Sequence, residues 1–406
     1  MKILFLTDNF FPETNAPAKR TLEHCKKWSD MGFEITVITG VPNFPKGKIF
    51  NGYKNKIYQI EKIHGIIVKR VWTFIYPNKG FFLRVLDYLS FMFSSLVCGL
   101  LSAKKDVIIA TSPQFFTLIS GFFISKIKKI PLVLEIRDLW PESIVSVGVM
   151  KEKSFLITFL KKIAISLYNQ SELIVCVTNS FKNDLIKKGV NENKIKVIPN
   201  GFEIDKSLKP SESINKVLRR YGINNDKFII SFTGTIGMAH GLEIILDAAS
   251  QVSDDIIFFV IGEGARKKIL IDKAKKRSIN NIFFIDHLEW QEIVNINQII
   301  DVHLVHLIKN DEFKKVIPSK VFESMALKKP IIMGVDGESR KILDDAECSI
   351  NIEPENANDL VKAIYYFKNN PEEIDRKGIK GFNYMLKNFS REILANKMIE
   401  NIKSLV

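Results

Sequence analysis

The chain has 406 residues, which is too long for one hydrophobic core of ordinary size, so two domains of similar size are expected. Its 46% hydrophobic and 26% charged residues are typical of a globular protein and exclude a disordered or fibrous one. The net charge of +14 predicts attraction to polyanions, but the sequence has no zinc-type Cys/His cluster, RNA-binding signature or basic arm, which argues against nucleic acid and leaves nucleotides and anionic membrane surfaces.

The chain begins with MKILFLTDNF, which turns polar after a short apolar run. That run is too short for the apolar region of a signal peptide and is expected to form a buried first strand. The four cysteines, Cys25, Cys98, Cys176 and Cys348, are far apart and lack metal-ligand or disulfide spacing. Buried, reduced thiols of a cytosolic protein are therefore expected.

Short β-branched runs alternate with helical patterns, such as 19–31, through the first half of the chain. The runs that we interpret as strands are 3–7, 35–39, 66–70, 107–111, 132–136 and 173–178. This alternation predicts an α/β fold with a mostly parallel, doubly wound sheet.

The segment 81–103 is the most apolar stretch, but Arg84 and Asp87 interrupt it and only 88–103 carries no charge. That run is shorter than the ~20 residues that a helix needs to span a bilayer. The segment 115–130, FFTLISGFFISKIKKI, again places aromatic residues beside lysines. Such surfaces favour anionic headgroups, so we expect peripheral attachment to a membrane rather than a span. The alternative is two core-packed helices with a solvated lysine cluster.

The sequence LEIRDLWPESI places polar residues directly after a predicted strand, where loops carry function. Arg137, Asp138, Trp140 and Glu142 lie in this loop. We assign a substrate-contacting role to Asp138. The alternative is an Arg–Asp pair that holds the loop, with Trp140 filling the core.

The second half of the chain repeats the strand pattern after a polar stretch at 203–227 that contains Pro210. Its predicted strands are 228–233, 256–261, 282–285, 302–307, 331–333 and 349–352. We therefore expect two Rossmann-like domains, 1–203 and 204–390, followed by a C-terminal helix in 391–406. Folds of this kind bind ligands at the carboxyl ends of their strands, so the active site is expected between the two domains.

The first predicted strand of the second half is followed by Gly234, Gly237 and Gly241 and then by a helix. Glycines at a strand-to-helix turn let backbone amides approach a phosphate, although they could simply form a tight turn. After the next strand, IGEGARKKIL brings Arg266 to the start of a helix. Arg266 is a candidate phosphate ligand, with a solvated helix face as the alternative.

The stretch VIPSKVFESMALKKPIIMG is the most informative part of the second half. Ser319 is expected to cap a helix in which Lys320 and Glu323, three residues apart, share one face. The pair could be a helical ion pair worth ~0.3 kcal/mol. In a cleft, the ammonium could instead meet a diphosphate while the carboxylate accepts hydrogen bonds from ribose hydroxyls.

Over nearly its whole length, the chain resembles glycosyltransferase family 4, and within it the WbuB-like group of N-acetylfucosamine and surface-polysaccharide glycosyltransferases. The resemblance rests on several motifs in the right order. They are MKILFLTDNFFPE, FEITVITGVPNFP, DVIIATSP, RDLWPES, VIPNGFE, the glycine turn, VIGEGA, and IPSKVFESMALKKPII followed by GE.

The resemblance implies a GT-B fold in which the second domain binds a UDP-sugar, the first binds the acceptor, and the last helix, 391–405, crosses back onto the first domain. It also implies transfer with retained anomeric configuration and no divalent metal or other cofactor. The residues expected to bind the nucleotide sugar are Gly234, Gly237, His240, Gly241, Arg266, Asn200 and Ser319. Those expected to act in catalysis are Asp138, Lys320 and Glu323.

The chain departs from the family pattern at its charged positions. The family pairs two glutamates with seven residues between them, whereas here the first position is Lys315 and only Glu323 matches. Thr235 and His240 stand where arginine and lysine are usual around the glycine turn. We therefore expect Lys320 and Arg266 to supply charge to the diphosphate, and Glu323 to contact the ribose.

The resulting hypothesis is transfer of an N-acetylhexosamine or N-acetylfucosamine-type sugar from UDP to an undecaprenyl-diphosphate-linked saccharide in capsule or O-antigen synthesis. The enzyme would be peripheral to the cytoplasmic face of the membrane, on an anionic surface. Two alternatives stay open: a UDP-sugar 2-epimerase, and a non-catalytic nucleotide-sugar-binding partner of a polysaccharide assembly complex.

Overall fold

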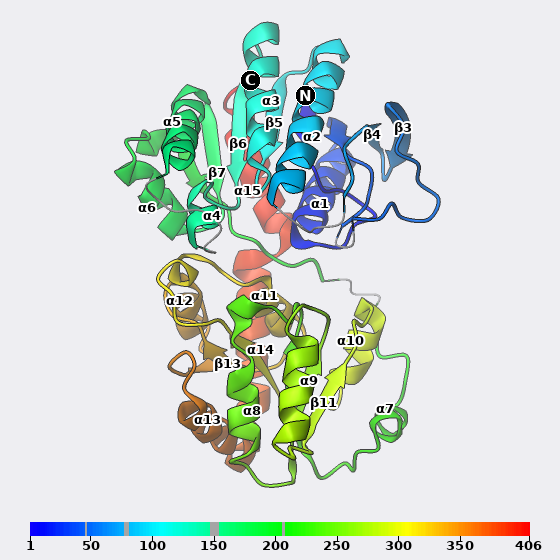
Figure 1. Ribbon diagram of the computed structural model, residues 1–406, viewed down its shortest axis with the longest axis vertical. Coiled ribbons are helices and arrows are strands. Elements are labelled where there is room, and N and C mark those ends of the chain that lie inside the picture. The colour runs from blue at the N-terminus through cyan, green and yellow to red at the C-terminus, as the bar shows by residue number, and fades with distance from the viewer. Residues whose placement is uncertain (45–46, 77–80, 147–153, 205–207) are drawn as a thin grey trace. The chain divides into compact units, whose positions relative to one another are not determined.

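The computed structural model describes the chain except for residues 45–46, 77–80, 147–153 and 205–207 (Figure 1). The chain divides into two compact units. Unit 1 comprises Met1–Asn200 together with Arg391–Val406, and unit 2 comprises Gly201–Ser390. The boundary between the units therefore lies after Asn200, three residues before the boundary that the sequence predicts.

Unit 1 is built on an eight-stranded sheet of order β3-β4-β2-β1-β5-β6-β7-β8. Its strands are β1 (Lys2–Leu6), β2 (Glu34–Thr39), β3 (Tyr58–Ile63), β4 (Ile66–Val71), β5 (Val107–Thr111), β6 (Leu132–Ile136), β7 (Leu173–Cys176) and β8 (Ile195–Val197). All neighbouring strands pair in parallel except β3 and β4. The central strands β5, β6 and β7 are buried along their whole length, as a parallel sheet covered on both faces requires.

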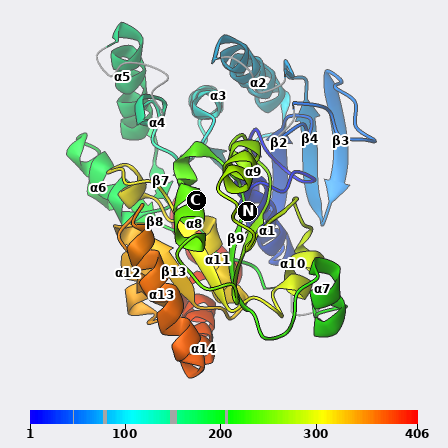
Figure 2. The same ribbon diagram turned by 60° about the horizontal axis from the view of Figure 1, so that its bottom comes forward.

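The helices of unit 1 cover both faces of this sheet. They are α1 (Ala16–Asp30), α2 (Phe81–Leu101), α3 (Phe115–Lys128), α4 (Glu142–Ser146), α5 (Phe155–Gln170), α6 (Asn179–Lys187) and α15 (Arg391–Lys403), with a short 3-10 helix, η1 (Glu192–Lys194). Figures 1 and 2 show α2, α3 and α5 following one another across one side of the sheet. Helices α1 and α15 pack together, and the indole Nε1 of Trp28 donates a hydrogen bond to the carbonyl of Ala395 at 3.0 Å.

Unit 2 is built on a six-stranded sheet of order β11-β10-β9-β12-β13-β14, in which every pairing is parallel. Its strands are β9 (Phe228–Thr233), β10 (Ile256–Ile261), β11 (Ile282–Ile285), β12 (Val302–His306), β13 (Ile331–Gly334) and β14 (Ser349–Asn351). This is the Rossmann order, and the chain reverses direction across the sheet between β9 and β12. Ligands bind such sheets at the carboxyl ends of the strands beside that point.

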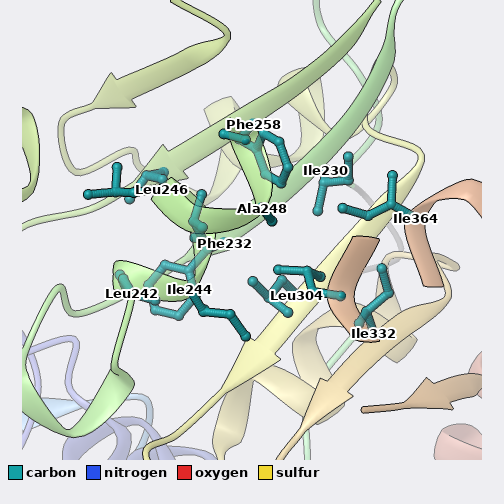
Figure 3. Close-up of a cluster of buried hydrophobic side chains, with 14 of the residues drawn as sticks. Ile230, Phe232, Leu242, Ile244, Leu246, Ala248, Phe258, Leu304, Ile332 and Ile364 are labelled. Atoms are coloured by element: carbon teal, nitrogen blue, oxygen red, sulfur yellow. The ribbon is translucent and has the colours of Figure 1, made fainter. Parts of the chain in front are cut away.

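The helices of unit 2 are α7 (Ile214–Tyr221), α8 (Glu243–Ala249), α9 (Lys267–Lys276), α10 (Trp290–Ile296), α11 (Ser319–Ala326), α12 (Glu338–Asp345), α13 (Ala357–Asn369) and α14 (Pro371–Phe389). Two short 3-10 helices, η2 (Met238–His240) and η3 (Phe313–Lys315), lie in the loops after β9 and β12. Figure 3 shows one core of this unit, where Phe232, Phe258 and Leu304 from the sheet meet Leu246 of α8 and Ile364 of α13.

The predicted α/β fold with two mostly parallel sheets is confirmed, and each of the twelve predicted strands overlaps a strand of the structure. Two strands were missed. β3 is an edge strand whose residues are only partly buried, so it lacks the apolar run that marks its neighbours. β8 has only three residues, which is too short to produce a recognisable pattern. All four cysteines are buried and none of them forms a disulfide, as expected.

Candidate functional site

A turn follows the carboxyl end of β9 and another follows that of β10, and the two turns pack closely against each other. Gly234 N donates to Ile261 O at 2.8 Å, and Ile236 N donates to Glu263 O at 2.8 Å. The fit depends on glycine, because a Cβ on Gly262 would lie 2.0 Å from the carbonyl oxygen of Gly234, and one on Gly264 would lie 2.2 Å from that of Ile236. The sequence pattern of glycines after both strands thus produces a single backbone surface at this edge of the sheet.

The three glycines of the turn after β9 have different structural roles. A Cβ on Gly234 would lie 2.5 Å from Cε of Lys320, so glycine here makes room for that lysine. Gly241 has a φ of +52°, and its added Cβ would lie 2.7 Å from Cγ2 of Ile308. Gly237 has an extended φ of −112°, and its nearest neighbour would be a methyl carbon of Thr235 at 3.7 Å. The backbone therefore requires glycine at 234 and 241 but not at 237.

Lys320 on α11 reaches across to this turn. Its ammonium lies over the ring of Phe232, 3.7 Å from the ring centroid. The nitrogen is buried, and no group among the described residues accepts a hydrogen bond from it. Burial lowers the pKa of Lys320 to about 7, although the nearby charge of Glu323 opposes this shift. A buried ammonium that lacks acceptors is a strong candidate for binding an anion.

Glu323 lies one turn further along α11 and lines a small pocket of about 20 Å³ together with Lys320, Thr233 and Trp290. The predicted placement of Lys320 and Glu323 on one side of the helix is confirmed, since both face this pocket. The prediction that Ser319 caps α11 is wrong. Pro318 occupies the cap position without a side-chain hydrogen bond, and Ser319 is the first helical residue.

His240, in the loop after β9, and His306, at the end of β12, form reciprocal hydrogen bonds. Nδ1 of His306 lies 2.6 Å from the carbonyl of His240, and Nδ1 of His240 lies 3.2 Å from the carbonyl of His306. Because a carbonyl only accepts, each Nδ1 carries the proton. Burial, followed by the charge of Lys320, lowers the pKa of His240 to about 4, so its ring is neutral at physiological pH. His240 therefore supplies no positive charge where the family pattern has a basic residue.

Arg266 is held by an acidic neighbour. Its guanidinium pairs with Glu243 on α8, which also accepts a hydrogen bond from Lys273 at 3.1 Å. Arg266 and Glu243 line a pocket of about 340 Å³ together with Gly241, Asp247 and Glu355, among other residues. Three carboxylates in this pocket oppose a diphosphate and suit a hydroxyl-rich group. Charge at the glycine turn thus comes mainly from Lys320 rather than Arg266.

Lys315, at the position where the family has its first glutamate, lies on η3 and pairs with Glu312 at 2.9 Å. The charge of Lys315 is therefore paired with a carboxylate of the same loop. Among the residues that the structure describes, no group of three or more His, Cys, Asp or Glu side chains is arranged to hold a metal ion. The expectation that no divalent metal is needed stays a prediction.

In unit 1, Asp138 follows the carboxyl end of β6 and is mostly buried. Burial raises its pKa to about 6, although hydrogen bonds from Ser143 and the backbone of Leu139 oppose this shift. Ser112 Oγ accepts hydrogen bonds from the backbone amides of Arg137 at 2.7 Å and Asp138 at 3.2 Å, which fixes the start of this loop. The ring of Trp140 stacks on Phe115 with centroids 5.6 Å apart. A substrate role for Asp138 stays a prediction.

Asn200 is the last residue of the main segment of unit 1. Its side-chain oxygen lies 3.5 Å from Nη1 of Arg20 on α1, and the same nitrogen donates to the carbonyl of Pro199 at 2.6 Å. The structure thus places Asn200 beside a buried arginine of unit 1, whereas Lys320 and Glu323 belong to unit 2. Its role in nucleotide binding stays a prediction.

Sequence reasoning missed several residues that shape the site. His306 receives a backbone hydrogen bond from Glu355 on Nε2 at 2.9 Å, and it locks the loop that carries His240. The signal available was a pair of histidines, His303 and His306, within the predicted strand 302–307. Thr233 and Trp290 line the small pocket with Lys320, but only the three-dimensional arrangement brings them there.

Two family models match the chain in succession. Residues 18–206 match the model described as Glycosyltransferase Family 4, and residues 213–383 match the model described as Glycosyl transferases group 1. Together they span most of the chain. The putative colanic acid biosynthesis glycosyl transferase WcaI of Escherichia coli is 26% identical over 337 residues, which cover 80% of this chain and 81% of WcaI.

Solved structures of similar fold cover the whole chain. HepE of Anabaena, in complex with UDP and glucose, has a TM-score of 0.72 at 16% identity, with 100% of both chains covered. WaaG, a glycosyltransferase involved in lipopolysaccharide biosynthesis, has a TM-score of 0.67 at 14% identity, with 98% of both chains covered. These likenesses confirm the predicted GT-B fold of two Rossmann-like domains.

Proposed function

We propose that this chain, which matches the models described as Glycosyltransferase Family 4 and Glycosyl transferases group 1 in succession, transfers a sugar from a UDP-sugar to a lipid-linked saccharide in the synthesis of a bacterial surface polysaccharide. The sugar is of the N-acetylhexosamine or N-acetylfucosamine type, and the product belongs to a capsule or O-antigen. Transfer retains the anomeric configuration and needs no metal. The observation that carries the proposal is the buried ammonium of Lys320 at the glycine turn of unit 2, which has no hydrogen-bond acceptor among the described residues.

In the proposed reaction, negative charge develops on the diphosphate as it leaves the sugar. Lys320 and the backbone amides of the turn after β9 are fixed before the reaction begins, so they stabilise this charge without reorganising. Glu323, in the pocket beside Lys320, accepts hydrogen bonds from the ribose. Neutral His240 stays a partner of His306 and shapes the turn.

The relatives support a UDP-sugar and a polysaccharide product. HepE binds UDP together with glucose in one structure, and UDP-glucose in another. WcaI is associated by name with colanic acid, and WaaG with lipopolysaccharide. We transfer these substrate classes to this chain as part of the proposal, because the glycine turn and Lys320 give it the groups that a diphosphate requires.

The lipid-linked acceptor is supported by one side of unit 1. Helices α2 and α3 expose large apolar side chains there, namely Leu86, Phe93, Val97, Leu101, Phe123 and Ile127. Helix α5 follows α3 on the same side (Figures 1 and 2), and its Phe155 is 88% exposed. The basic residues Lys126, Lys128 and Lys129 end α3. Apolar side chains beside lysines suit the surface of an anionic membrane.

We propose that this side of unit 1 lies on the cytoplasmic face of the membrane and that α2 does not span the bilayer. Residues Leu83–Leu101 of α2 are long and apolar enough to cross a bilayer, by length and composition alone. However, Phe91 and Ser95 on this helix are fully buried, and Ser95 hydrogen-bonds Ser120 of α3 at 3.1 Å. A spanning orientation would break this packing, so an interfacial position is favoured.

The proposal is tested by incubating the whole chain with a panel of UDP-N-acetylhexosamines and a short-chain prenyl-diphosphate saccharide. Mass spectrometry should show the lipid gaining the mass of one sugar, and Glu323→Ala should lose this activity. Glu372→Ala, which changes an exposed residue of α14, is the matched control and should transfer at the wild-type rate. An isomerised UDP-sugar with unchanged lipid would instead indicate a 2-epimerase, and UDP binding without any conversion would indicate a non-catalytic partner.

A further inference from the structure

Three arginines gather at the carboxyl edge of the sheet in unit 1, and two of them are paired. Arg20 is fully buried, its Nε lies 2.8 Å from Oε1 of Glu135, and its other nitrogens donate to backbone carbonyls. Arg391, at the start of α15, forms an ion pair with Glu23. These two arginines therefore each have a carboxylate partner, and of their nitrogens only Nη1 of Arg391 is buried without a hydrogen-bond acceptor among the described residues.

Arg137 is the third arginine, and no carboxylate among the described residues forms an ion pair with its guanidinium. It follows β6 directly, and its backbone is held by Ser112. Nε and Nη1 of its guanidinium are buried, and no group among the described residues accepts a hydrogen bond from either nitrogen. A buried donor without a partner is unfavourable, and more so when it is charged. The fold thus carries an unfavourable feature that a ligand could relieve.

The charges around Arg137 leave one positive charge in excess. The groups that face it are Glu135, Arg20 and Arg391, and Glu135 is already bound by Arg20 and by the hydroxyl of Thr111. His24 is close to the same arginines, and burial together with their charges keeps its pKa well below its ordinary value, so it is neutral. Counting the ion pair of Arg391, three guanidinium groups share two carboxylates.

Burial also lowers the pKa of Arg137 to about 9; Glu135 opposes this shift, and Arg20 and Arg391 add to it. The guanidinium remains charged at neutral pH but is poorly compensated. A phosphate placed against this guanidinium would restore the charge balance, and it can accept two parallel hydrogen bonds along either edge of the planar group, from Nε and Nη2 or from Nη1 and Nη2, so it would satisfy one of the two nitrogens that now lack an acceptor.

We propose that Arg137 is a phosphate-binding residue of unit 1, which holds a phosphate oxygen of one of the two diphosphates in the reaction. This inference rests on the proposed function, because that reaction brings two diphosphates to the protein. One belongs to the UDP-sugar and the other to the prenyl-diphosphate acceptor. The chemistry of recognition is the same for both, so the experiment must separate them.

The test uses direct binding to the whole chain, which requires no turnover and therefore gives an answer even if no sugar transfer is found. Calorimetry measures the affinities of UDP and of a short-chain prenyl-diphosphate saccharide for the wild type and for Arg137→Gln. Arg219→Gln, which changes an exposed arginine of α7, is the matched control. Thermal unfolding of each variant is recorded with and without ligand.

Arg137→Gln should weaken one of the two ligands about tenfold or more, because a charge-assisted hydrogen bond contributes roughly 1.5–3 kcal/mol. Selective loss of the prenyl diphosphate assigns Arg137 to the acceptor, and selective loss of UDP assigns it to the donor. The unfolding midpoint without ligand should not fall, since an uncompensated buried charge has been removed. The ligand-induced rise in the midpoint should shrink in the variant.

The proposal is overturned if both affinities stay within twofold of the wild type. It is equally overturned if the midpoint falls as far as it does in Arg20→Gln while binding is unchanged, because Arg137 would then be a structural residue. If Arg137→Gln does not fold, Arg137→Lys provides the second variant. It keeps the charge but loses the planar fork, and it should weaken the same ligand to a smaller extent.

Discussion

At Lys320, burial lowers the pKa of the ammonium to about 7, so the side chain is mostly neutral in the free protein at pH 8. A bound diphosphate favours the charged form and raises this pKa again. UDP binding at pH 8 should therefore take up about one proton. Calorimetry in buffers of different ionisation enthalpy measures this uptake, and Lys320→Met should abolish it. Proton uptake that persists in Lys320→Met would assign it to another group.

Lys320 is expected to lower the stability of the fold while it strengthens the binding of UDP. In the unfolded chain the lysine has its ordinary pKa of 10.5, so the unfolded state holds more protons between about pH 7 and that value. The free energy of unfolding should therefore rise with pH across this window. Lys320→Met should flatten this dependence and raise the unfolding midpoint at neutral pH, while weakening UDP about tenfold or more. Lys341→Met, on the exposed surface of α12, should change neither quantity.

Arg20 provides the opposite case, because it is a paired residue. Replacing it by methionine breaks a buried ion pair and removes the hydrogen bonds that Arg20 donates to Glu135 and to two backbone carbonyls, which costs roughly 3–5 kcal/mol. Unfolding of Arg20→Met in denaturant should therefore show a large loss of stability. A loss below about 1 kcal/mol would mean that the pair contributes no more than an ion pair on the surface.

At the scale of the elements, the two turns at the end of β9 and β10 depend on Gly262, whose φ is +137° and whose Cβ would strike the carbonyl of Gly234. Gly262→Ala should cost roughly 1–3 kcal/mol and weaken UDP by displacing the turn. Gly237→Ala is the matched control, because its extended backbone and open surroundings accept a methyl group. Equal effects of the two substitutions on UDP affinity would contradict the assigned roles of these glycines.

Most elements could be predicted from the sequence because their signals are local. β9 and β10 are apolar runs whose ends match the prediction, and the spacing of Lys320 and Glu323 places both on one side of α11. The cap of α11 could not be predicted, because a serine at the first helical position resembles a serine at the cap position. The isolation of Arg137 could not be predicted either, since it depends on which of three arginines from distant segments receives each carboxylate.

For the whole molecule, the net charge of +14 and the exposed apolar residues of unit 1 predict binding to anionic vesicles that weakens as salt rises. The double variant Phe93→Glu with Leu101→Glu should reduce the fraction of protein that floats with vesicles about tenfold or more, because each large apolar side chain contributes roughly 1.5–3 kcal/mol on burial. Both residues are exposed, so the fold should be unaffected.

Ile379→Glu changes an exposed apolar residue on α14 of unit 2 and is the matched control for flotation. It should float like the wild type. Equal loss in the control would show that general charge, rather than the α2 and α3 surface, governs attachment. Equal binding to uncharged and anionic vesicles would contradict the electrostatic contribution.

Transfer of a sugar from UDP to a lipid is tested most directly by the ratio of UDP released to lipid glycosylated in one sample. The whole chain is incubated with its UDP-sugar and a prenyl-diphosphate saccharide in anionic vesicles, and both products are quantified by mass spectrometry. The account predicts equal amounts of the two products, and loss of both in Glu323→Ala. UDP release without glycosylated lipid, or an isomerised UDP-sugar without UDP release, would contradict it.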